Sequence, residues 1–262
     1  MTAAALTLAV SGGIAEILLV RPELMNRFDP QLHHELVETL TLVGADPDVR
    51  CVVLGSTGRA FSAGGDFALM EAAHADAVLR SEIVDDGRRL VQSFLDLPQP
   101  VVVAVQGAAI GLGATVALLC DVIVAARGAQ LADTHVQIGL VAGDGGCLVW
   151  PQSVGMARAR RHLLTGDPLD AETAWQLGLV TDLVDTPDEA LPAARAIAKR
   201  IAALAPLAVQ GTKRALNHVT QQRADEVVDL AFDLEATTLA SDDLLEGIAS
   251  FKDRRPPAYT GR

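Results

Sequence analysis

The segment at residues 101–121, VVVAVQGAAIGLGATVALLCD, constrains the fold of this chain more than any other. Its β-branched start is typical of a buried strand, the glycines at positions 107, 111 and 113 predict a turn, and the second apolar run predicts a helix. Backbone N–H groups at the start of a helix can bind an anion. The segment lacks phosphate-loop and dinucleotide spacing. Two interpretations remain: a site for an anion that forms during a reaction, such as an enolate oxygen, or a packing turn.

Composition narrows the classes of protein to consider. Of the 262 residues, 50% are hydrophobic but only 3% are aromatic, so we expect an aliphatic core of buried parallel strands and close-packed helices. A net charge of −12 argues against nucleic acid as a partner. No apolar run reaches membrane-spanning length, and the first residues lack the basic start of a signal peptide, so we expect a cytoplasmic protein with no membrane partner. We expect no metal site, because the cysteines lack metal-ligand spacing: Cys51, Cys120 and Cys147.

Hydrophobic periodicity predicts an α/β core followed by a helical region. We expect strands at residues 13–20, 49–54, 101–105, 121–126 and 179–184. We expect helices at residues 31–43, 76–95, 114–120, 171–177, 189–204, 206–220 and 224–240, with a last one that Ser241 caps. Glycine-rich loops at 56–66 and 135–146 follow strands, where ligand sites of α/β folds usually lie.

An ordered set of short motifs covers nearly the whole chain. It comprises Arg21-Pro22 with Asn26, GRAFSAGGD at 58–66, LPQP at 97–100, the glycines of 107–113, Cys120-Asp121, GLVAGDGG at 139–146, LTG at 164–166, GLV at 178–180, and SDD with EG within 241–247. The pattern resembles the crotonase (enoyl-CoA hydratase/isomerase) superfamily. The resemblance implies a crotonase-like superhelix of ββα turns over residues 1–187, and a helical C-terminal trimerisation region over 188–262. It also implies an acyl-CoA substrate, with coenzyme A as part of the substrate and not as a tightly bound cofactor, and a homotrimer or a dimer of trimers.

The resemblance further implies an oxyanion hole made of two backbone amides, those of Gly65 and Leu112. Glycine is common in the family at the second position, but a backbone donor does not depend on the side chain. The Ala63 carbonyl would meet the adenine and Asp66 would brace the loop, whereas the alternative is a plain turn. Positions near the expected path of the CoA phosphates carry Arg27 and Arg59, and the terminal segment, which relatives place near a neighbour's ligand, carries Phe251, Lys252 and Arg254. Ordinary surface charge is the alternative for these cations.

The chain departs from the family at its two catalytic glutamates. Their positions hold Thr115, three residues after Leu112, and His135, twenty residues further on. Thr115 cannot act as a base at neutral pH, although its hydroxyl could hold a water, and we expect it to bond back onto the preceding turn.

His135 and Asp144 form a candidate catalytic pair. They are nine residues apart across a loop rich in glycine, so the carboxylate can reach one ring nitrogen and leave the other as a base. The alternatives are a structural histidine and an aspartate that caps the helix beginning near Gly145. We interpret Asp133 as a turn residue, and the remaining histidines match no motif: His33, His34, His74, His162 and His218.

Three functions remain open at this point. The first is an enoyl-CoA hydratase/isomerase-type enzyme that forms an enolate. The second is a retro-Claisen hydrolase of a β-diketone, because the His135–Asp144 spacing and the following Trp150-Pro151 resemble the 6-oxocamphor hydrolase branch, which carries at the position of Leu112 a histidine that this chain lacks. The third is an acyl-CoA-binding protein without catalysis. We favour the first, since the oxyanion loops keep the family pattern.

Overall fold

The computed structural model describes residues 4–262, and its larger β-sheet has six strands. Their order across the sheet is β1 (Leu6–Ser11), β2 (Ile14–Leu19), β3 (Cys51–Ser56), β5 (Val101–Val105), β7 (Val122–Ala126) and β10 (Asp182–Val184). The first two strands form an antiparallel hairpin, whose turn has Gly12 and Gly13 at φ of 59° and 78°, and every other neighbouring pair is parallel. The central strands are buried on both faces, as their continuous apolar sequences require.

A second sheet of short strands completes a ββα spiral. It contains β4 (Ala60–Ser62), β6 (Ala108–Ile110), β8 (Gln130–Ala132) and β9 (Leu169–Asp170), in that order. The chain passes from β3 to β4, from β5 to β6 and from β7 to β8, and helical structure follows each pair. The repeated unit is therefore two strands and a helical segment, which confirms the predicted crotonase-like α/β superhelix.

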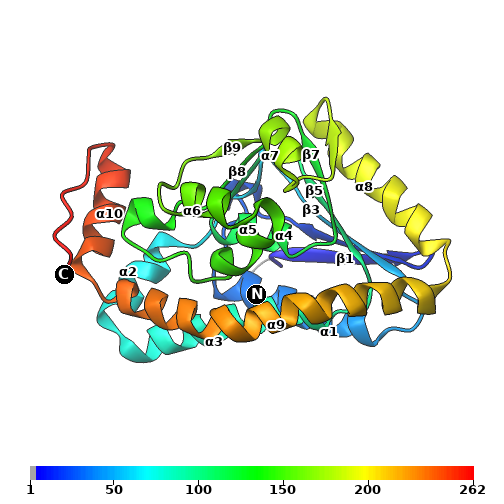
Figure 1. Cartoon of the computed structure of the whole chain (residues 1–262), viewed down its shortest axis with the longest axis horizontal. Coiled ribbons are helices and arrows are strands. Elements are labelled where there is room, and N and C mark those ends of the chain that lie inside the picture. The colour runs from blue at the N-terminus through cyan, green and yellow to red at the C-terminus, as the bar shows by residue number, and fades with distance from the viewer. Residues whose placement is uncertain (1–3) are drawn as a thin grey trace.

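Helices cover both faces of the larger sheet (Figure 1). They are α1 (Pro30–Ala45), α2 (Phe67–Ala75), α3 (Ala77–Asp96), α4 (Leu112–Leu118), α5 (Gly146–Val154), α6 (Met156–Leu163), α7 (Ala171–Leu177), α8 (Pro187–Ala202), α9 (Pro206–Leu239) and α10 (Asp242–Asp253), with 3₁₀ turns η1 (Pro22–Leu24) and η2 (His135–Ile138). On one face, α8 presents a row of small side chains at every fourth position to the valines of β3, β5 and β7: Ala190, Ala194, Ala198 and Ala202. The other face packs into the main core with α1, α3 and α4.

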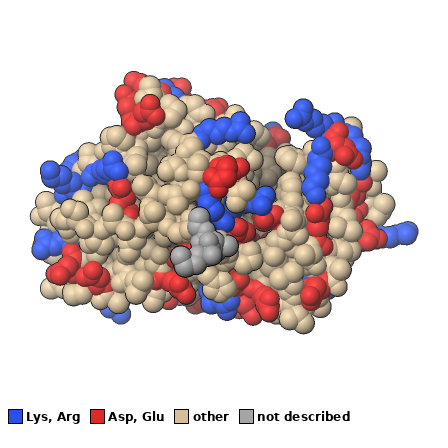
Figure 2. Space-filling model, turned by 180° about the vertical axis from the view of Figure 1, so that it is seen from behind, with Lys and Arg blue, Asp and Glu red and all other residues tan. Residues whose placement is uncertain are grey.

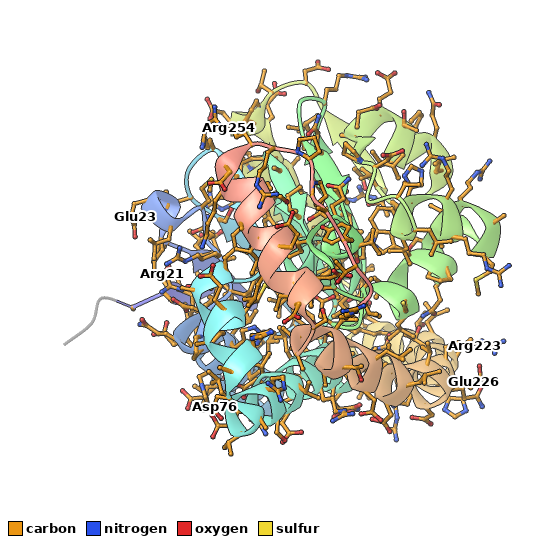
Figure 3. The ribbon with its side chains drawn as sticks, turned by 90° about the vertical axis from the view of Figure 1, so that its left-hand side faces the viewer. Arg21, Glu23, Asp76, Arg223, Glu226 and Arg254 are labelled. Carbon is orange, nitrogen blue, oxygen red and sulfur yellow. The ribbon has the colours of Figure 1, made fainter. Side chains whose placement is uncertain are left out.

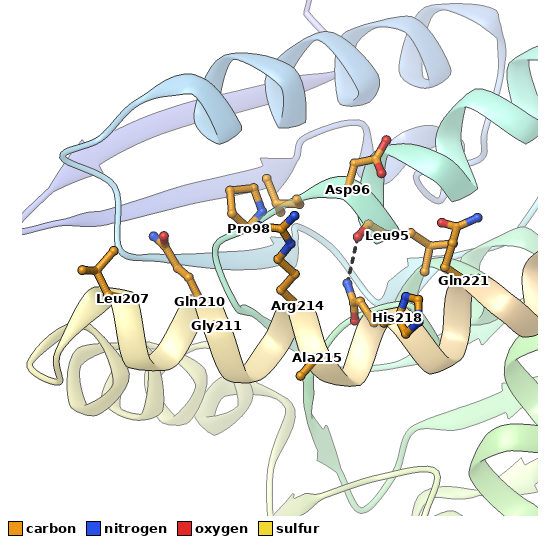
Figure 4. A pocket seen from close by; sticks show the side chains of 12 residues that line it. Leu95, Asp96, Pro98, Leu207, Gln210, Gly211, Arg214, Ala215, His218 and Gln221 are labelled. Atoms are coloured by element: carbon orange, nitrogen blue, oxygen red, sulfur yellow. Dashed lines mark hydrogen bonds between the residues drawn. The ribbon is translucent and has the colours of Figure 1, made fainter.

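Helix α9 is a single helix where two were predicted, at residues 206–220 and 224–240. It runs for 34 residues without interruption, and the polar stretch there stays helical because α9 packs on α3 and α5 along its length. Ala224 is buried, and the Asn217 side chain donates to the Leu95 carbonyl at 2.9 Å. A surface hollow of about 980 Å³ lies between α9 and residues 95–98 (Figure 4).

Other predicted elements hold with shifted bounds. Ser241 caps α10, as predicted, and Asp76, expected to be the first residue of a helix, is the N-cap of α3. The expected strand at 179–184 begins only at Asp182, and β1, α2 and α6 are additions to the prediction. The division at residue 187 stays a prediction, although α8, which follows it, packs directly on the larger sheet. None of the helices within residues 4–262 is both long and apolar enough to span a membrane.

The surface mixes charges of both signs. Figure 2 shows Lys, Arg, Asp and Glu side chains interspersed over one face of the molecule. Most ion pairs lie at the surface, such as Arg195 with Glu16 and Arg223 with Glu226. The prediction that nucleic acid is not a partner rests on the net charge of −12 and stays a prediction.

Candidate active site

Loops at the ends of parallel strands bring the predicted site residues together. Residues 63–66 follow β4, residues 111–112 join β6 to α4, and residues 133–135 follow β8. Glycine permits the close approach of the first two loops, because a Cβ on Gly64, which has φ of 85°, would lie 2.7 Å from the Ile110 carbonyl oxygen. Gly111, with φ of 52°, lies under the His135 ring, since a Cβ there would be 3.3 Å from its Cε1 atom.

Two cavities meet at these loops. The inner cavity, of about 50 Å³, is bordered by Gly65, Leu112, His135 and Asp144, and its remaining wall is mostly apolar. The outer cavity, of about 300 Å³, is bordered by Gly65, Gly111, His135 and Phe251. Within residues 4–262, neither the Gly65 nor the Leu112 amide donates to a protein acceptor. Both predicted oxyanion donors therefore border the inner cavity and are available to a ligand.

His135 lies between two aspartates. Its Nδ1 is 2.6 Å from Asp133 Oδ1, and its Nε2 is 3.2 Å from Asp144 Oδ2. The Thr115 hydroxyl donates to the other Asp144 oxygen, Oδ1, at 3.1 Å. All four side chains are buried, with exposed fractions of 0% for Thr115 and 1% for Asp133. A continuous chain of hydrogen-bonding groups thus runs from Asp133 to Thr115.

This geometry confirms the contact between His135 and Asp144 but corrects three details. The second ring nitrogen is not free, because Asp133, which was expected to be a turn residue, faces it. Asp144 does not cap α5, since Gly145 is its N-cap and provides no side-chain bond. Thr115 bonds to Asp144 and not to the preceding turn, because the loop of residues 143–145 lies directly against the start of α4.

The cluster favours a charged histidine and a charged Asp144. Burial disfavours the cation, but the Asp144 and Asp133 carboxylates outweigh it and raise the pKa of His135 well above its ordinary value. Burial likewise disfavours the Asp144 anion, yet the His135 charge and the bonds from His135 and Thr115 lower the pKa of Asp144. At neutral pH, Asp144 is therefore a carboxylate at the cavity wall, paired with an imidazolium.

Comparisons with known proteins agree with this geometry. A family model described as enoyl-CoA hydratase/isomerase matches residues 9–262. The chain is 33% identical over 259 residues to 1,2-epoxyphenylacetyl-CoA isomerase of Escherichia coli, with 97% of each chain covered. It is also 33% identical over 256 residues to (E)-benzylidenesuccinyl-CoA hydratase of Thauera aromatica, covering 97% of this chain and 98% of the relative. The crystal structure of an enoyl-CoA hydratase/isomerase from Mycobacterium paratuberculosis matches with a TM-score of 0.90 and 36% identity, covering 95% and 98%. The chain belongs to the enoyl-CoA hydratase/isomerase family.

Membership confirms the predicted superfamily and makes the chain an enzyme of that family. Two of the residues that the resemblance assigned to coenzyme A line the outer cavity. Ala63 and Phe251 border this cavity, and the Phe251 ring meets the Phe67 ring edge-on at 5.3 Å. Helix α10, which carries Phe251, packs beside α2 and η2, and Arg254 lies at its far end (Figure 3).

Three of the predicted cations already have protein partners. Arg27 pairs with Asp66 at 3.1 Å, and Lys252 pairs with Glu71 at 2.5 Å. Arg59 is exposed and directs Nη2 at the sulfur of Met25, 3.5 Å away. Asp66 also caps α2, because it accepts from the Ala68 amide, and its expected role in bracing the loop stays a prediction. The proposed CoA contacts of Arg27, Arg59 and Lys252 stay predictions.

The sequence interpretation missed three polar residues at the site. Asp133 lies two residues before a histidine at a strand end, and that Asp-x-His spacing was the available signal. Glu235 on α9 and His33 on α1 also border the inner cavity. Neither belongs to a motif, and only the packing of α1 and α9 around the core brings them there.

The donor atoms of Asp133, His135 and Asp144 lie within 4.8 Å of one another, a spacing that could hold a metal ion. The hydrogen-bonded arrangement accounts for the same closeness, since each ring nitrogen faces a carboxylate oxygen. The expectation of no metal site stays a prediction.

Proposed function

We propose that this enzyme acts on an acyl-CoA thioester and stabilises the enolate that forms on the thioester oxygen. The observation that carries the proposal is the pair of amides at Gly65 and Leu112, which are without an acceptor within residues 4–262 and border the same cavity as Asp144. Two N–H donors at one cavity suit an oxygen that gains negative charge during a reaction, and each is worth about 2.7–4 kcal/mol in a water-excluded site.

In this proposal, the Asp144–His135 pair carries out the proton transfer. Hydratases of the family use two glutamates, whose positions correspond here to Thr115 and His135. In hydration, Asp144 accepts a proton from water as the water oxygen bonds to C3 of an enoyl thioester. The C2–C3 π electrons move toward the thioester oxygen, and the same proton is then delivered to C2. His135 stabilises the Asp144 carboxylate before and after this transfer.

The relatives support a thioester substrate, because the Escherichia coli and Thauera aromatica proteins are named as an isomerase and a hydratase of CoA esters. The outer cavity beside Ala63 and Phe251 is the proposed path of the pantetheine arm. We also propose a cytoplasmic homotrimer or dimer of trimers. Exposed leucines along α9 support the assembly, since association would cover them: Leu207, Leu216, Leu230 and Leu234. Light scattering should give the mass of three or six chains, and the mass of one chain would contradict this.

Turnover of enoyl-CoA esters tests the proposal. The protein is incubated with crotonyl-CoA and with longer and aryl-substituted enoyl-CoA esters, and loss of the conjugated thioester absorbance is followed. Calorimetry measures binding of free coenzyme A in parallel. We expect turnover that Asp144→Asn abolishes and Asp225→Asn, on the exposed side of α9, leaves unchanged. Absence of both turnover and binding would contradict the proposal, and tight binding without turnover would indicate a binding protein instead.

A second function is supported by the Asp133–His135 contact. A carboxylate on Nδ1 orients the ring, and transfer of the Nε2 proton to Asp144 would leave Nε2 as the base that activates water. Water would then attack one ketone of a β-diketone, the bond to the carbon between the two ketones would break, and the amides would hold the enolate that leaves. Cleavage of cyclic 1,3-diketones that His135→Ala abolishes would support this function, and cleavage at an unchanged rate in that variant would exclude it.

A further inference from the structure

Glu235 is a buried carboxyl group that the mechanism above does not use. It lies on α9 and borders the inner cavity, with 7% of its surface exposed. Within residues 4–262, its carboxyl forms no hydrogen bond, and its Oε2 atom is fully enclosed. Gly143 makes room for the group, because a Cβ at that position would lie 2.6 Å from Oε2. The fold therefore accommodates this carboxyl closely while leaving its hydrogen-bonding capacity unused.

The surroundings of Glu235 favour the protonated, neutral form of its carboxyl group. Burial is the main cause, and the nearby negative charges of Asp144 and Asp133 act in the same direction, whereas the positive charge of His135 acts against them. Together these effects raise the pKa of Glu235 to about 8. At neutral pH the group is therefore a carboxylic acid with an O–H donor.

A second polar group borders the same cavity without a partner. The Nδ1 atom of His33 on α1 is buried and has no hydrogen-bond partner within the described residues. Burial lowers the pKa of His33, so the ring is neutral, and it meets the Phe28 ring edge-on at 5.4 Å. Apart from Asp66 and the His135–Asp144 pair, the other side chains that border this cavity are apolar, among them Phe28, Leu69, Met70, Ile83, Val84 and Phe232. Unpartnered polar groups on an apolar wall are costly unless a ligand completes their hydrogen bonds.

We propose that the inner cavity binds an acyl group that carries an oxygen of its own beyond the thioester carbonyl, with the Glu235 carboxyl as the hydrogen-bond partner of that oxygen. This inference rests on the proposed function, because Gly65 and Leu112 border the same space and would hold the thioester end. A cavity of about 50 Å³ holds only a few non-hydrogen atoms, so the oxygen belongs to the part of the acyl group close to the thioester.

Binding of two matched thioesters tests this inference. Acetoacetyl-CoA and butyryl-CoA have the same number of acyl carbons, and the first has a keto oxygen where the second has a methylene group. Calorimetry gives the Kd of each for the wild type, Glu235→Gln and Glu235→Leu, and chromatography checks that each thioester is recovered intact. If acetoacetyl-CoA is consumed, its KM replaces its Kd. Glu38→Leu, at an exposed position of α1, is the control.

We expect the wild type and the control to bind acetoacetyl-CoA at least tenfold more tightly than butyryl-CoA. Glu235→Gln should keep most of this preference, since an amide also donates. Glu235→Leu should abolish it through weaker binding of acetoacetyl-CoA, with butyryl-CoA bound as well as before. A folded Glu235→Leu protein that keeps the preference, or a wild type without one, would overturn the inference while the proposed function stands. If the wild type binds neither thioester, both are overturned.

Discussion

Helix α9 carries two buried ionisable side chains with opposite surroundings. Lys213, near its start, is 5% exposed and donates to the Gln99 carbonyl at 2.9 Å and to Asp121 Oδ2 at 2.7 Å. The same Asp121 oxygen accepts from the Val101 amide at 2.7 Å. Glu235, near the other end of α9, forms no side-chain hydrogen bond within the described part of the chain. One end of the helix has a completed polar network, and the other end leaves a carboxyl group at a cavity.

The difference separates a structural role from a functional one. The Lys213 network ties α9 to the first residue of β5, so it fixes the helix against the central strand that precedes the oxyanion loop. Glu235 stabilises nothing of this kind, because an enclosed and unpartnered carboxyl lowers stability. A fold tolerates such a group where a ligand supplies the missing partner, and for this reason buried polar groups without partners identify candidate binding sites.

The largest effect should come from Asp144, and it should be an effect on rate. Asp144→Asn removes the proposed proton acceptor and should lower kcat about 10²–10⁴-fold, which corresponds to about 3–5 kcal/mol in the barrier. The free energy of unfolding should fall by no more than about 3 kcal/mol, the low end for a broken buried pair, because His135 keeps Asp133 as a charge partner. Steady-state kinetics on the thioester that the wild type converts, together with urea unfolding, measures both. A variant within tenfold of the wild-type rate would show that Asp144 is not the acceptor.

Lys213 should affect stability and leave the rate unchanged. Lys213→Met leaves Asp121 without its cation and should lower the free energy of unfolding by about 3 kcal/mol, the low end for a broken buried pair, since Asp121 keeps the Val101 amide and is 27% exposed. The kcat of the folded variant should match the wild type. Urea unfolding and kinetics measure the two quantities, and Arg223→Met, in an exposed pair on the same helix, should cost less than about 1 kcal/mol. Equal losses of unfolding free energy in Lys213→Met and Arg223→Met would show that the Lys213 network stabilises the fold no more than an exposed ion pair does.

The sequence predicts the fold well where a pattern is local. The strand and glycine turn of residues 101–113 were readable, because β-branched runs and glycines act over a few residues. Strands β4, β6 and β8, of three residues each, lie below what periodicity can detect. The continuity of α9 was also missed, since residues 221–223 are polar and only packing against α3 and α5 keeps the helix together there.

The candidate site likewise contains residues that the sequence identified and residues that it could not identify. Spacing and the family resemblance identified His135 and Asp144, and the structure brings them into contact. The same spacing could not say which ring nitrogen Asp144 would face, because that depends on how the loop of residues 143–146 folds over α4. Glu235 lies a hundred residues beyond His135 in an ordinary helical pattern, and its importance arises only from burial. Sequence reasoning thus found the residues that motifs carry and missed those that tertiary packing selects.

The pH dependence of the free energy of unfolding should show that Glu235 is protonated in the folded protein. Its folded pKa of about 8 lies above the unfolded value, so the folded state holds a proton that the unfolded state releases, and stability falls as pH rises from about 4.5 to 8. The slope from this group is at most about 1.4 kcal/mol per pH unit. Glu235→Gln should remove it, with a gain of about 2 kcal/mol between pH 5 and 7 relative to the wild type. Urea unfolding at several pH values provides the measurement.

His135 and Asp144 lie close enough to shift the pKa of Glu235 and have shifted pKa values themselves, so only the difference between wild type and variant isolates the Glu235 contribution. His135 has a raised pKa and therefore also loses stabilising effect as pH increases, in both proteins alike. Parallel curves for the wild type and Glu235→Gln would mean that Glu235 is ionised in the fold. The contrast with Lys213 would then need a different explanation.

The smallest effect should come from Thr115, which acts through Asp144. Thr115→Val removes the hydroxyl that donates to Asp144 Oδ1 at 3.1 Å but keeps the shape of a fully buried side chain. Asp144 would then be less well oriented, and kcat should fall about tenfold or less, about 1 kcal/mol in the barrier, with little change in KM. Thr115→Ser restores the hydroxyl and should recover most of the rate. A serine variant as slow as the valine variant would show that Thr115 contributes packing alone, because the two differ in the hydroxyl that a positioning role requires.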